Sequence, residues 1–255
     1  MNKDTSKISV LYAGHGEIVT ITYSSGYDTD TANYLAIYGN TTRGLQADPE
    51  IEVTRLGGPA IIDQFPSSLE EMQKYDVVFL GDVGSDTLLV TPEVMKGNRG
   101  VNRLKLIQEY VRLGGGFLMC AGWGSFGGYR NNGRYHGTPV EEVLPVNIKD
   151  GDDRVEVPEG FRFTVTNMDH PTAAGLDWDG ADYYMLGYNR VTAKSNSTVI
   201  AKYENDPVMV AWDYYKGRSI AFSCAFELHW AGTFVKWSGY SKFLSQIVRW
   251  LARKV

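Results

Sequence analysis

The chain has 255 residues, 43% of them hydrophobic, and 30 acidic residues against 25 basic ones give it a formal net charge of −5. This length and hydrophobic content suffice for one large α/β domain with a buried core, and the acidic balance lacks the basic footprint of a nucleic-acid-binding protein. No apolar run reaches the length of a membrane span, and the first residues lead into a strand-like segment instead of a signal peptide, so we expect a cytoplasmic protein without a membrane partner.

The first eighty residues alternate between strand-like and helix-like segments. Short apolar or alternating runs at 8–12 and 51–56 predict two strands, and residues 31–45 between them predict a helix. A β-α-β order of this kind makes the two strands parallel. Residues 67–75 predict a further helix with a serine cap and a glutamate three residues later, and the apolar run 76–82 predicts a fully buried strand.

The alternation continues at residues 102–113, where apolar residues fall on one face of a helix that stops at three consecutive glycines. The run 117–120 predicts the next strand. Repeated alternation predicts an open, mostly parallel sheet with helices on both faces, a three-layer α/β/α sandwich of the flavodoxin-like type. Ligands of such sheets bind outside the carboxyl ends of the strands, where Asp82 and Cys120 fall.

From residue 129 to 189 the periodicity weakens and Gly, Pro, Asp and Asn accumulate, which predicts a long functional insert that covers the carboxyl edge of the sheet. Further elements follow, three strands and an amphipathic closing helix, at 198–203, 208–214, 218–225 and 238–253. No repeat, low-complexity tract or linker divides the chain. We therefore expect a single domain over residues 1–255.

The glycine-loaded stretch from Gly114 to Gly128 reads as a helix end, a buried strand and a tight turn, and it is the most informative part of the chain. Glycine lets a sharp strand-to-helix corner form and lets a ligand approach the backbone. Cys120 falls at that corner and is a candidate nucleophile. Alternatively, the corner lies at Ala121 or Gly122, and Cys120 is a small apolar residue that ends its strand.

The two cysteines, Cys120 and Cys224, are 104 positions apart in separate apolar segments. This spacing favours reduced thiols over a disulfide framework, and no Cys-x-x-Cys pair suggests zinc. We expect no cofactor.

Several phrases spread along the sequence are informative when they are taken together. They are Tyr75-Asp-Val-Val, Asn102-Arg-Leu with Tyr110-Val and Gly114-Gly-Gly, Arg134-Tyr-His with Leu144-Pro-Val, Asp152-Asp-Arg-Val-Glu-Val-Pro158, Leu186-Gly-Tyr-Asn-Arg190 and His229-Trp230. Together they resemble the putative glutamine amidotransferase family, a divergent branch of the class I glutamine amidotransferase-like fold near the trehalose utilisation proteins. The resemblance covers nearly the whole chain.

The resemblance implies a reaction in which a cysteine attacks an amide carbon, a histidine moves the proton and a carboxylate orients the histidine. In the family of active enzymes the cysteine lies in Gly-x-Cys-x-Gly, and here Leu118 replaces the first glycine. The expected His-Pro-Glu after the late strand is also missing. His229 and Glu227 come later and in reverse order, so the usual triad is incomplete.

Two hypotheses follow. The first is a hydrolase or amidotransferase acting on a small amide or ester, with Cys120 as nucleophile, His229 as general base, Glu227 as its orienting carboxylate and backbone N–H groups of residues 121–124 as an oxyanion hole. The second is a catalytically silent ligand-binding or assembly protein on the same fold.

Other polar groups also fall near the predicted carboxyl edge. Histidines and carboxylates there could form a metal site, but no His-x-His or His-x-x-x-His spacing supports it, so we expect no metal; the set is His136, His170, Asp82, Asp152, Asp153 and Glu156. His170 before a proline is better explained by a turn with a structural hydrogen bond. Asp153, Arg154 and Glu156 could equally form an ion pair on one strand face, whereas Arg134 and Arg154 could clamp a carboxylate or phosphate.

Aromatic residues are dense in loop-like segments around this edge. They suit a pocket for a sugar or other small polar ligand, or a subunit interface in a homo-oligomer, although packing of the insert onto the sheet explains most of them. Trp123 and Trp230 are expected in the cleft because they adjoin the elbow and His229. The predicted ligand-binding residues are Asp28, Asp82, Trp123, Ser125, Arg134, His136 and Trp230.

Overall fold

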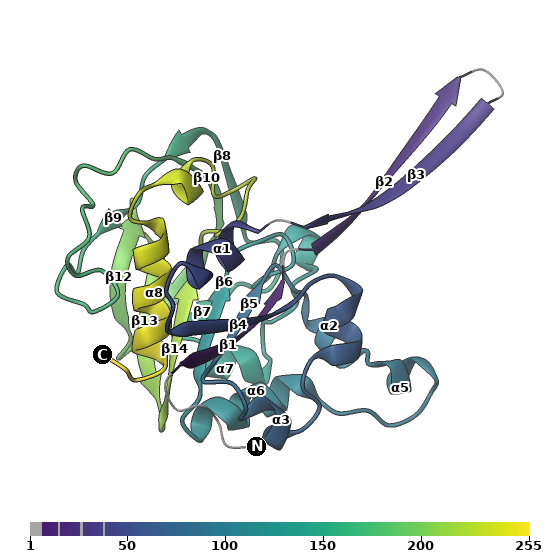
Figure 1. The fold of residues 1–255 in the computed structure, drawn as a ribbon, viewed down its shortest axis with the longest axis horizontal. Coiled ribbons are helices and arrows are strands. Elements are labelled where there is room, and N and C mark those ends of the chain that lie inside the picture. The colour runs from purple at the N-terminus through teal and green to yellow at the C-terminus, as the bar shows by residue number, and fades with distance from the viewer. Residues whose placement is uncertain (1–6, 15, 26–27, 38) are drawn as a thin grey trace.

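A computed structural model describes residues 7–14, 16–25, 28–37 and 39–255, with side chains from residue 39 onwards and for 7–14. Its centre is an eight-stranded sheet in the order β4-β1-β5-β6-β14-β13-β12-β9 (Figure 1). The prediction of an α/β fold with a large, mostly parallel sheet is confirmed.

The parallel half of the sheet consists of five strands, listed in spatial order: β4 (Ile51–Leu56), β1 (Ile8–Gly14), β5 (Val77–Gly81), β6 (Gly116–Cys120) and β14 (Gly217–Phe222). All residues of β5 and β6 are buried, because neighbours cover both faces and the strands read as continuous apolar runs. In register, Gly81 pairs with Cys120 and Cys120 with Phe222. These residues therefore lie along one carboxyl edge.

The sheet continues in antiparallel fashion through β13 (Asp206–Tyr214), β12 (Thr198–Tyr203) and β9 (Thr164–Val165). The three late strands expected from the sequence are confirmed, except that β14 ends at Phe222, three residues before the predicted end.

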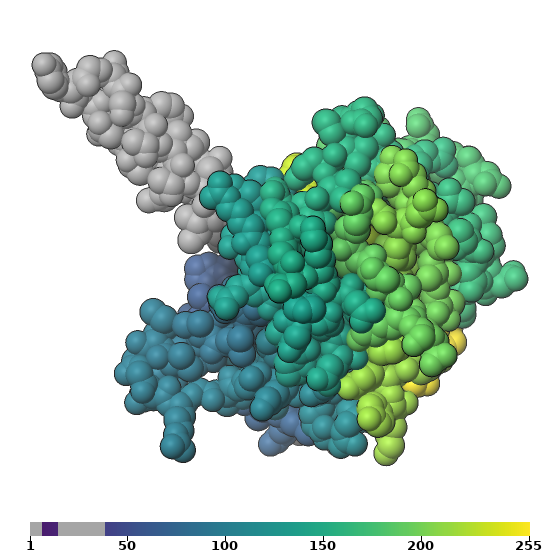
Figure 2. Space-filling view, turned by 180° about the vertical axis from the view of Figure 1, so that it is seen from behind, coloured from purple at the N-terminus to yellow at the C-terminus, as the bar shows by residue number. Residues whose placement is uncertain are grey.

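The helices pack in two groups around the parallel strands. α8 packs on α1 and on β1, β6 and β14, whereas α6 packs on β6 and β14 and on α3, α4 and α7. Their bounds are α1 Asn40–Gln46, α2 Pro59–Gln64, α3 Leu69–Met72, α4 Ser85–Leu89, α5 Pro92–Met95, α6 Arg103–Arg112, α7 Pro139–Val143 and α8 Tyr240–Leu251. The segment around α5 protrudes from one side of the body (Figure 2), and Met95 in this segment is 74% exposed.

A long hairpin replaces most of the helix predicted at residues 31–45. Strands β2 (Gly16–Ser25) and β3 (Asp28–Ile37) pair antiparallel along their whole length, and helix begins only at Asn40. The helix prediction is wrong for 31–37. The β-branched run in 16–25 supplies a pairing partner that a short helix-like pattern does not reveal.

The insert, together with the strand β11 (Val191–Ala193) that follows it, forms two small antiparallel sheets. β7 (Val146–Ile148) pairs with β11, and β8 (Arg154–Phe161) pairs with β10 (Met185–Asn189). The 3-10 turns are η1 (Tyr129–Asn131) and, beyond the insert, η2 (Phe234–Lys236). Side-chain packing between rings of Phe161, Tyr188 and Tyr203 holds β8 and β10 to β12.

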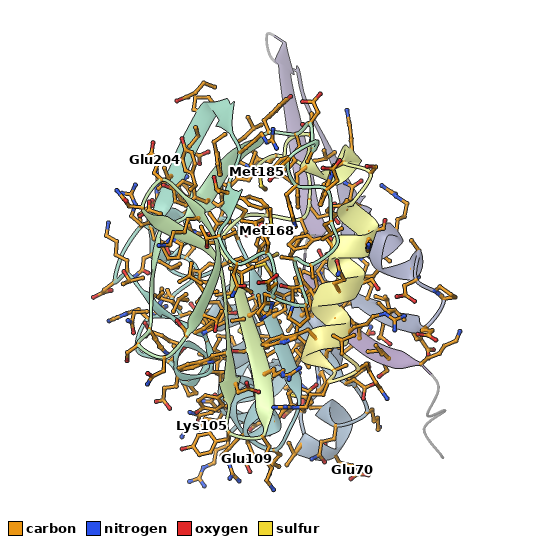
Figure 3. The ribbon with its side chains drawn as sticks, turned by 90° about the vertical axis from the view of Figure 1, so that its left-hand side faces the viewer. Glu70, Lys105, Glu109, Met168, Met185 and Glu204 are labelled. Atoms are coloured by element: carbon orange, nitrogen blue, oxygen red, sulfur yellow. The ribbon has the colours of Figure 1, made fainter. Side chains whose placement is uncertain are left out.

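The two ends of the sheet differ in what they carry. Charged residues such as Glu70, Lys105 and Glu109 gather at the end away from the hairpin, as Figure 3 shows. The hairpin and the glycine-rich loop after β6 lie at the carboxyl edge. No helix in the described part of the chain is long and apolar enough to span a bilayer.

Candidate functional site

Asp82 lies directly after β5, in a strained turn that leads into α4. Its backbone φ is +59°, in the left-handed region that few non-glycine residues adopt. The turn is fixed by its own hydrogen bonds: the Asp82 N–H donates to Ser125 Oγ at 3.0 Å, and the Gly124 N–H donates to Asp82 Oδ1. Burial raises the pKa of Asp82, and the Gly124 hydrogen bond and the nearby His229 lower it in part.

Gly122 makes room for that carboxyl group. A Cβ built on Gly122 would overlap Asp82 Cγ and Oδ1, so any side chain there would displace the carboxyl group. The glycine expected to relieve a cysteine elbow therefore serves the aspartate on the neighbouring strand.

Cys120 ends β6 beneath this turn and has no exposed surface. Among residues 120–124 none has a positive φ, so the strained corner expected there is absent; the left-handed residues nearby are Asp82 and Phe126. Burial raises the pKa of the Cys120 thiol well above its usual value, the Asp82 charge raises it further, and the Phe226 backbone N–H lowers it only in part. The described surroundings keep this thiol protonated.

Glu227 is also completely buried, but its carboxylate binds the start of α1. Oε2 accepts from the Asn40 backbone N–H at 3.1 Å and from Asn40 Nδ2 at 2.9 Å, and Oε1 accepts from the Thr41 N–H at 2.8 Å. Among the described residues no hydrogen bond joins Glu227 to His229. The carboxylate fills the place that a capping side chain would take at a helix N-terminus.

His229 packs against Trp123 and is close enough to Asp82 to lower the pKa of that carboxyl group. Its ring centroid is 5.5 Å from that of Trp123, edge to face, and its backbone φ is +82°. Both rings are exposed, Trp123 by 42%. The structure therefore brings His229 to Asp82 and Trp123, whereas Cys120 lies below the surface that they form.

The loop at residues 122–133 is held by two buried polar residues of the insert, Asp153 and Asn189. Asp153 accepts from the N–H groups of Gly127 and Gly128, each at 2.8 Å, and from Asn189 Nδ2 at 2.7 Å. Asn189 Oδ1 in turn accepts from the Gly122 N–H at 3.1 Å. Burial raises the pKa of Asp153, and these hydrogen bonds lower it in part.

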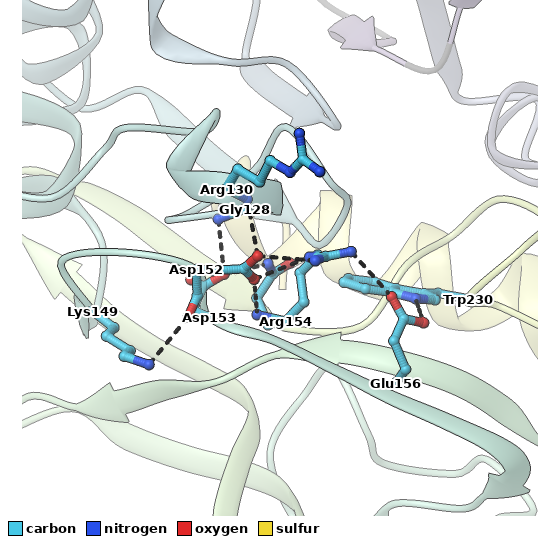
Figure 4. Close-up of polar contacts among 9 residues, drawn as sticks. Gly128, Arg130, Lys149, Asp152, Asp153, Arg154, Glu156 and Trp230 are labelled. Atoms are coloured by element: carbon cyan, nitrogen blue, oxygen red, sulfur yellow. Dashed lines mark hydrogen bonds and ion pairs between the residues drawn. The ribbon is translucent and has the colours of Figure 1, made fainter.

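Arg154 stacks on the aromatic side of the site. Its guanidinium carbon is 5.2 Å from the Trp123 ring centroid and 4.1 Å from that of Tyr129. Its Nε and Nη2 donate to the two oxygens of Asp152 at 3.0 and 2.9 Å, and Nη1 lies 3.6 Å from Glu156 (Figure 4). Since this bidentate pair occupies the planar fork of the guanidinium, Arg154 acts as a support for the rings.

Trp230 is buried at the far side of Glu156. Its Nε1–H donates to Glu156 Oε2 at 2.8 Å, and Figure 4 shows the indole beside that carboxylate. Trp230 is therefore the last member of a chain of polar contacts that links Asp152, Arg154 and Glu156.

The remaining predicted residues are dispersed. Ser125 is buried and supports Asp82, but Arg134 is exposed and pairs with Asp86 at 2.9 Å, and His136 Nδ1 contacts the Ile148 carbonyl at 2.8 Å. Asp28 begins β3 at the tip of the hairpin, where its backbone pairs with Ser25; its side chain lies outside the described parts.

The alternative metal set does not assemble. His170 Nδ1 is 2.8 Å from Thr172 Oγ1 and also accepts from the Thr172 N–H, so the His-Pro segment is the structural turn that the sequence favoured. Within the described residues, no three side chains of His, Cys, Asp and Glu gather in a way that could hold a metal ion.

Sequence reasoning identified Asp82, Trp123 and His229 but not the supports beneath them. The sequence suggests Asp153 only as a metal ligand or ion-pair partner, and it gives no role to Asn189, which falls in one of the family phrases. A buried aspartate within a polar run and an asparagine ending a strand are signals too common to reveal their partners. Strain in the loop, with positive φ at Phe126, Arg130, Asn131 and Arg134, also has no sequence signature.

Comparison with known proteins identifies the chain's relatives. A family model described as putative glutamine amidotransferase matches residues 9–253. Two solved Salmonella typhimurium proteins are similar over nearly their whole length: cytoplasmic protein STM3548 at 31% identity, TM-score 0.89, covering 95% of this chain and 98% of that one, and cytoplasmic protein STM1381 at 30% identity, TM-score 0.89, covering 96% and 99%.

More distant structures share the fold alone. A ThuA-like protein from Parabacteroides merdae has a TM-score of 0.54 at 14% identity, covering 97% of this chain and 91% of that chain. No curated protein matches in sequence.

Proposed function

Because the chain belongs to the putative glutamine amidotransferase family, we propose that it uses the family's carboxyl-edge site to bind a small, neutral, polar ligand without thiol catalysis. The proposal rests on which side chains of the site are exposed to solvent. Cys120 is fully buried, whereas Trp123 and His229 are exposed beside Asp82.

A glutaminase requires a thiolate within reach of an imidazole. Here the charge that acts on Cys120 comes from the carboxylates of Asp82 and Glu227, and both raise the pKa of the thiol. The Glu227 carboxylate accepts hydrogen bonds from the backbone N–H groups of Asn40 and Thr41, and among the described residues it is not hydrogen-bonded to an imidazole. These contacts support a site in which the amidotransferase triad is not used.

The remaining groups favour a neutral ligand. The Arg154 fork is already paired with Asp152, so it offers no free cation for a carboxylate or phosphate. The exposed Trp123 ring offers a flat apolar face, and Asp82 and His229 beside it supply hydrogen-bonding groups. Stacking on an indole combined with hydrogen bonds to a carboxyl and an imidazole suits a sugar, polyol or small amide.

A thermal-shift screen tests this proposal with neutral sugars, sugar acids and glutamine. Binding at about 100 times the Kd stabilises a protein by about 2.7 kcal/mol, which is about 5–10 °C for a chain of this size. We expect a shift with neutral ligands that Trp123→Ala abolishes. Tyr215→Ala is the matched control, because Tyr215 is an aromatic residue 74% exposed in the turn after β13.

The same screen includes Cys120→Ser. Retained binding in Cys120→Ser and loss in Trp123→Ala would support the proposal. Sugar acids that bind more tightly than neutral sugars would overturn the proposed preference for a neutral ligand. Glutamine turnover that disappears in Cys120→Ser would overturn the proposal in favour of the Cys120–His229–Glu227 mechanism.

We also infer a cytoplasmic location and the three-layer flavodoxin-like arrangement for this chain. Two similar Salmonella proteins are named as cytoplasmic, and both cysteines are free and buried, as suits a reducing compartment. Two helix groups packed around one sheet support the layering.

A further inference from the structure

Five side chains of the candidate site form a closed ring of contacts. The centroid of the His229 ring lies 5.5 Å from that of Trp123 and 6.0 Å from that of Trp230. Trp230 Nε1 donates to Glu156, and Arg154 Nη1 lies 3.6 Å from the same carboxylate (Figure 4). The Arg154 guanidinium carbon is in turn 5.2 Å from the Trp123 ring centroid. The pair of Arg154 and Glu156 therefore adjoins the exposed rings of the site.

Arg154 and Glu156 face each other with hydrogen-bonding capacity left over. Arg154 Nη1 and Glu156 Oε1 are 3.6 Å apart, which is too long for a hydrogen bond. The bonds of Arg154 to Asp152 are 3.0 and 2.9 Å, and the bond of Trp230 to Glu156 is 2.8 Å. Among the described residues, Nη1 and Oε1 make no hydrogen bond of their own. The Glu156 side chain is 46% exposed, so a ligand can reach it.

A donor and an acceptor held side by side suit two neighbouring hydroxyl groups. One hydroxyl can donate to the Glu156 carboxylate while the next accepts from Arg154, because a hydroxyl is both a donor and an acceptor. An ionised carboxylate on a ligand offers acceptors only. In addition, Asp152 and Glu156 place two formal negative charges around the single positive charge of Arg154, which disfavours an anionic ligand.

We propose that Arg154 and Glu156 bind a vicinal diol, so that the ligand of the site is a sugar or cyclic polyol with two adjacent free hydroxyl groups. This inference rests on the proposed function, which supplies the neutral ligand beside Trp123. It narrows the ligand class, because a simple small amide has no such pair of hydroxyl groups. Glu156 is then a residue that determines specificity among neutral ligands.

Isothermal titration calorimetry of the full chain tests the proposal with D-glucose, D-galactose and myo-inositol, and with singly deoxygenated forms of each compound that binds. Glu156→Gln should weaken binding of the parent compound at least about tenfold, because a hydrogen bond to a charged acceptor is lost. Glutamine keeps an oxygen that can accept from Trp230 Nε1, so the fold should be preserved. Glu159→Gln is the matched control: Glu159 is an exposed glutamate of the same strand, and its replacement should change the affinity by less than about threefold.

The deoxy compounds separate a contact with the ligand from a structural role of Glu156. The form that lacks the hydroxyl bound by Glu156 should bind the wild type at least about tenfold more weakly than its parent, and Glu156→Gln should bind the two equally.

Binding that Trp123→Ala abolishes, but that neither Glu156→Gln nor any deoxygenation weakens, would overturn this inference and leave the proposed function intact. Tighter binding of D-glucosamine than of D-glucose would also overturn it, because Glu156 would then serve a cation. A wild type that binds none of these compounds would overturn it as well, and the thermal-shift screen would then test the proposed function separately.

Discussion

Glu227 has either a structural role at the start of α1 or a catalytic role beside His229, and the stability of its variants distinguishes the two. Its carboxylate accepts hydrogen bonds from the first residues of α1. Three N–H donors of Asn40 and Thr41 end on it, and all three bonds are 3.1 Å or shorter. A buried donor that loses its acceptor costs about 1–3 kcal/mol, and removing one partner of a buried charged contact costs about 3–5 kcal/mol. We therefore expect Glu227→Ala to lower the free energy of unfolding by about 3–5 kcal/mol.

Glu227→Gln should have a smaller effect of about 1–3 kcal/mol, because one amide oxygen still accepts while the amide nitrogen faces a donor. Urea unfolding followed by tryptophan fluorescence measures both variants. Glu159→Ala, at an exposed position of β8, is the control and should stay within about 0.5 kcal/mol of wild type. A loss below about 1 kcal/mol in Glu227→Ala would refute the argument and leave orientation of His229 as the explanation.

Further predictions concern the site and its pH dependence. The raised pKa of Cys120 contributes stability that is present below the unfolded thiol's pKa near ~8.5 and is lost as the pH rises, so Cys120→Ser should reduce the alkaline slope of unfolding by up to about 1.4 kcal/mol per pH unit. His170, whose pKa burial and the Arg218 charge lower to about 4, favours folding in its neutral form. Stability should therefore fall as the pH drops from about 6.5 towards 4, and His170→Gln should flatten that limb in acid titrations. Gly122→Ala should displace the Asp82 carboxyl group, cost about 1–3 kcal/mol in urea unfolding and abolish the ligand-induced thermal shift; retained binding would show that the approach of Gly122 is unimportant.

The two central parallel strands, β5 and β6, could be predicted because each reads as a continuous apolar run. The strands 77–81 and 116–120 are buried throughout, and the short length of these runs and the glycines at their ends favour a buried strand over a helix. The segment 31–37 could not be assigned in the same way, because its partner strand lies at 16–25 and pairing is a property of two segments, not one.

The candidate site could be predicted only where its residues directly follow the ends of strands. Asp82 and Trp123 follow strands or glycines, and fold rules place such residues at the carboxyl edge. The bonds of Glu227 to Asn40 join residues 187 positions apart, and those of Asn189 to Gly122 join residues 67 apart. Nothing in the local pattern reveals which distant backbone donors a buried polar side chain will meet.

Hydrogen bonds between the glycine-rich loop and the insert suggest how ligand preference could change among related chains. Amides of Gly122, Gly127 and Gly128 end on Asn189 and Asp153, which belong to the insert and not to the sheet. Substitutions in the insert would therefore change the conformation of the glycine-rich loop without changing the residues of the sheet. Grafting the insert of one relative onto another should carry its ligand preference along, provided that this aspartate and asparagine travel with it.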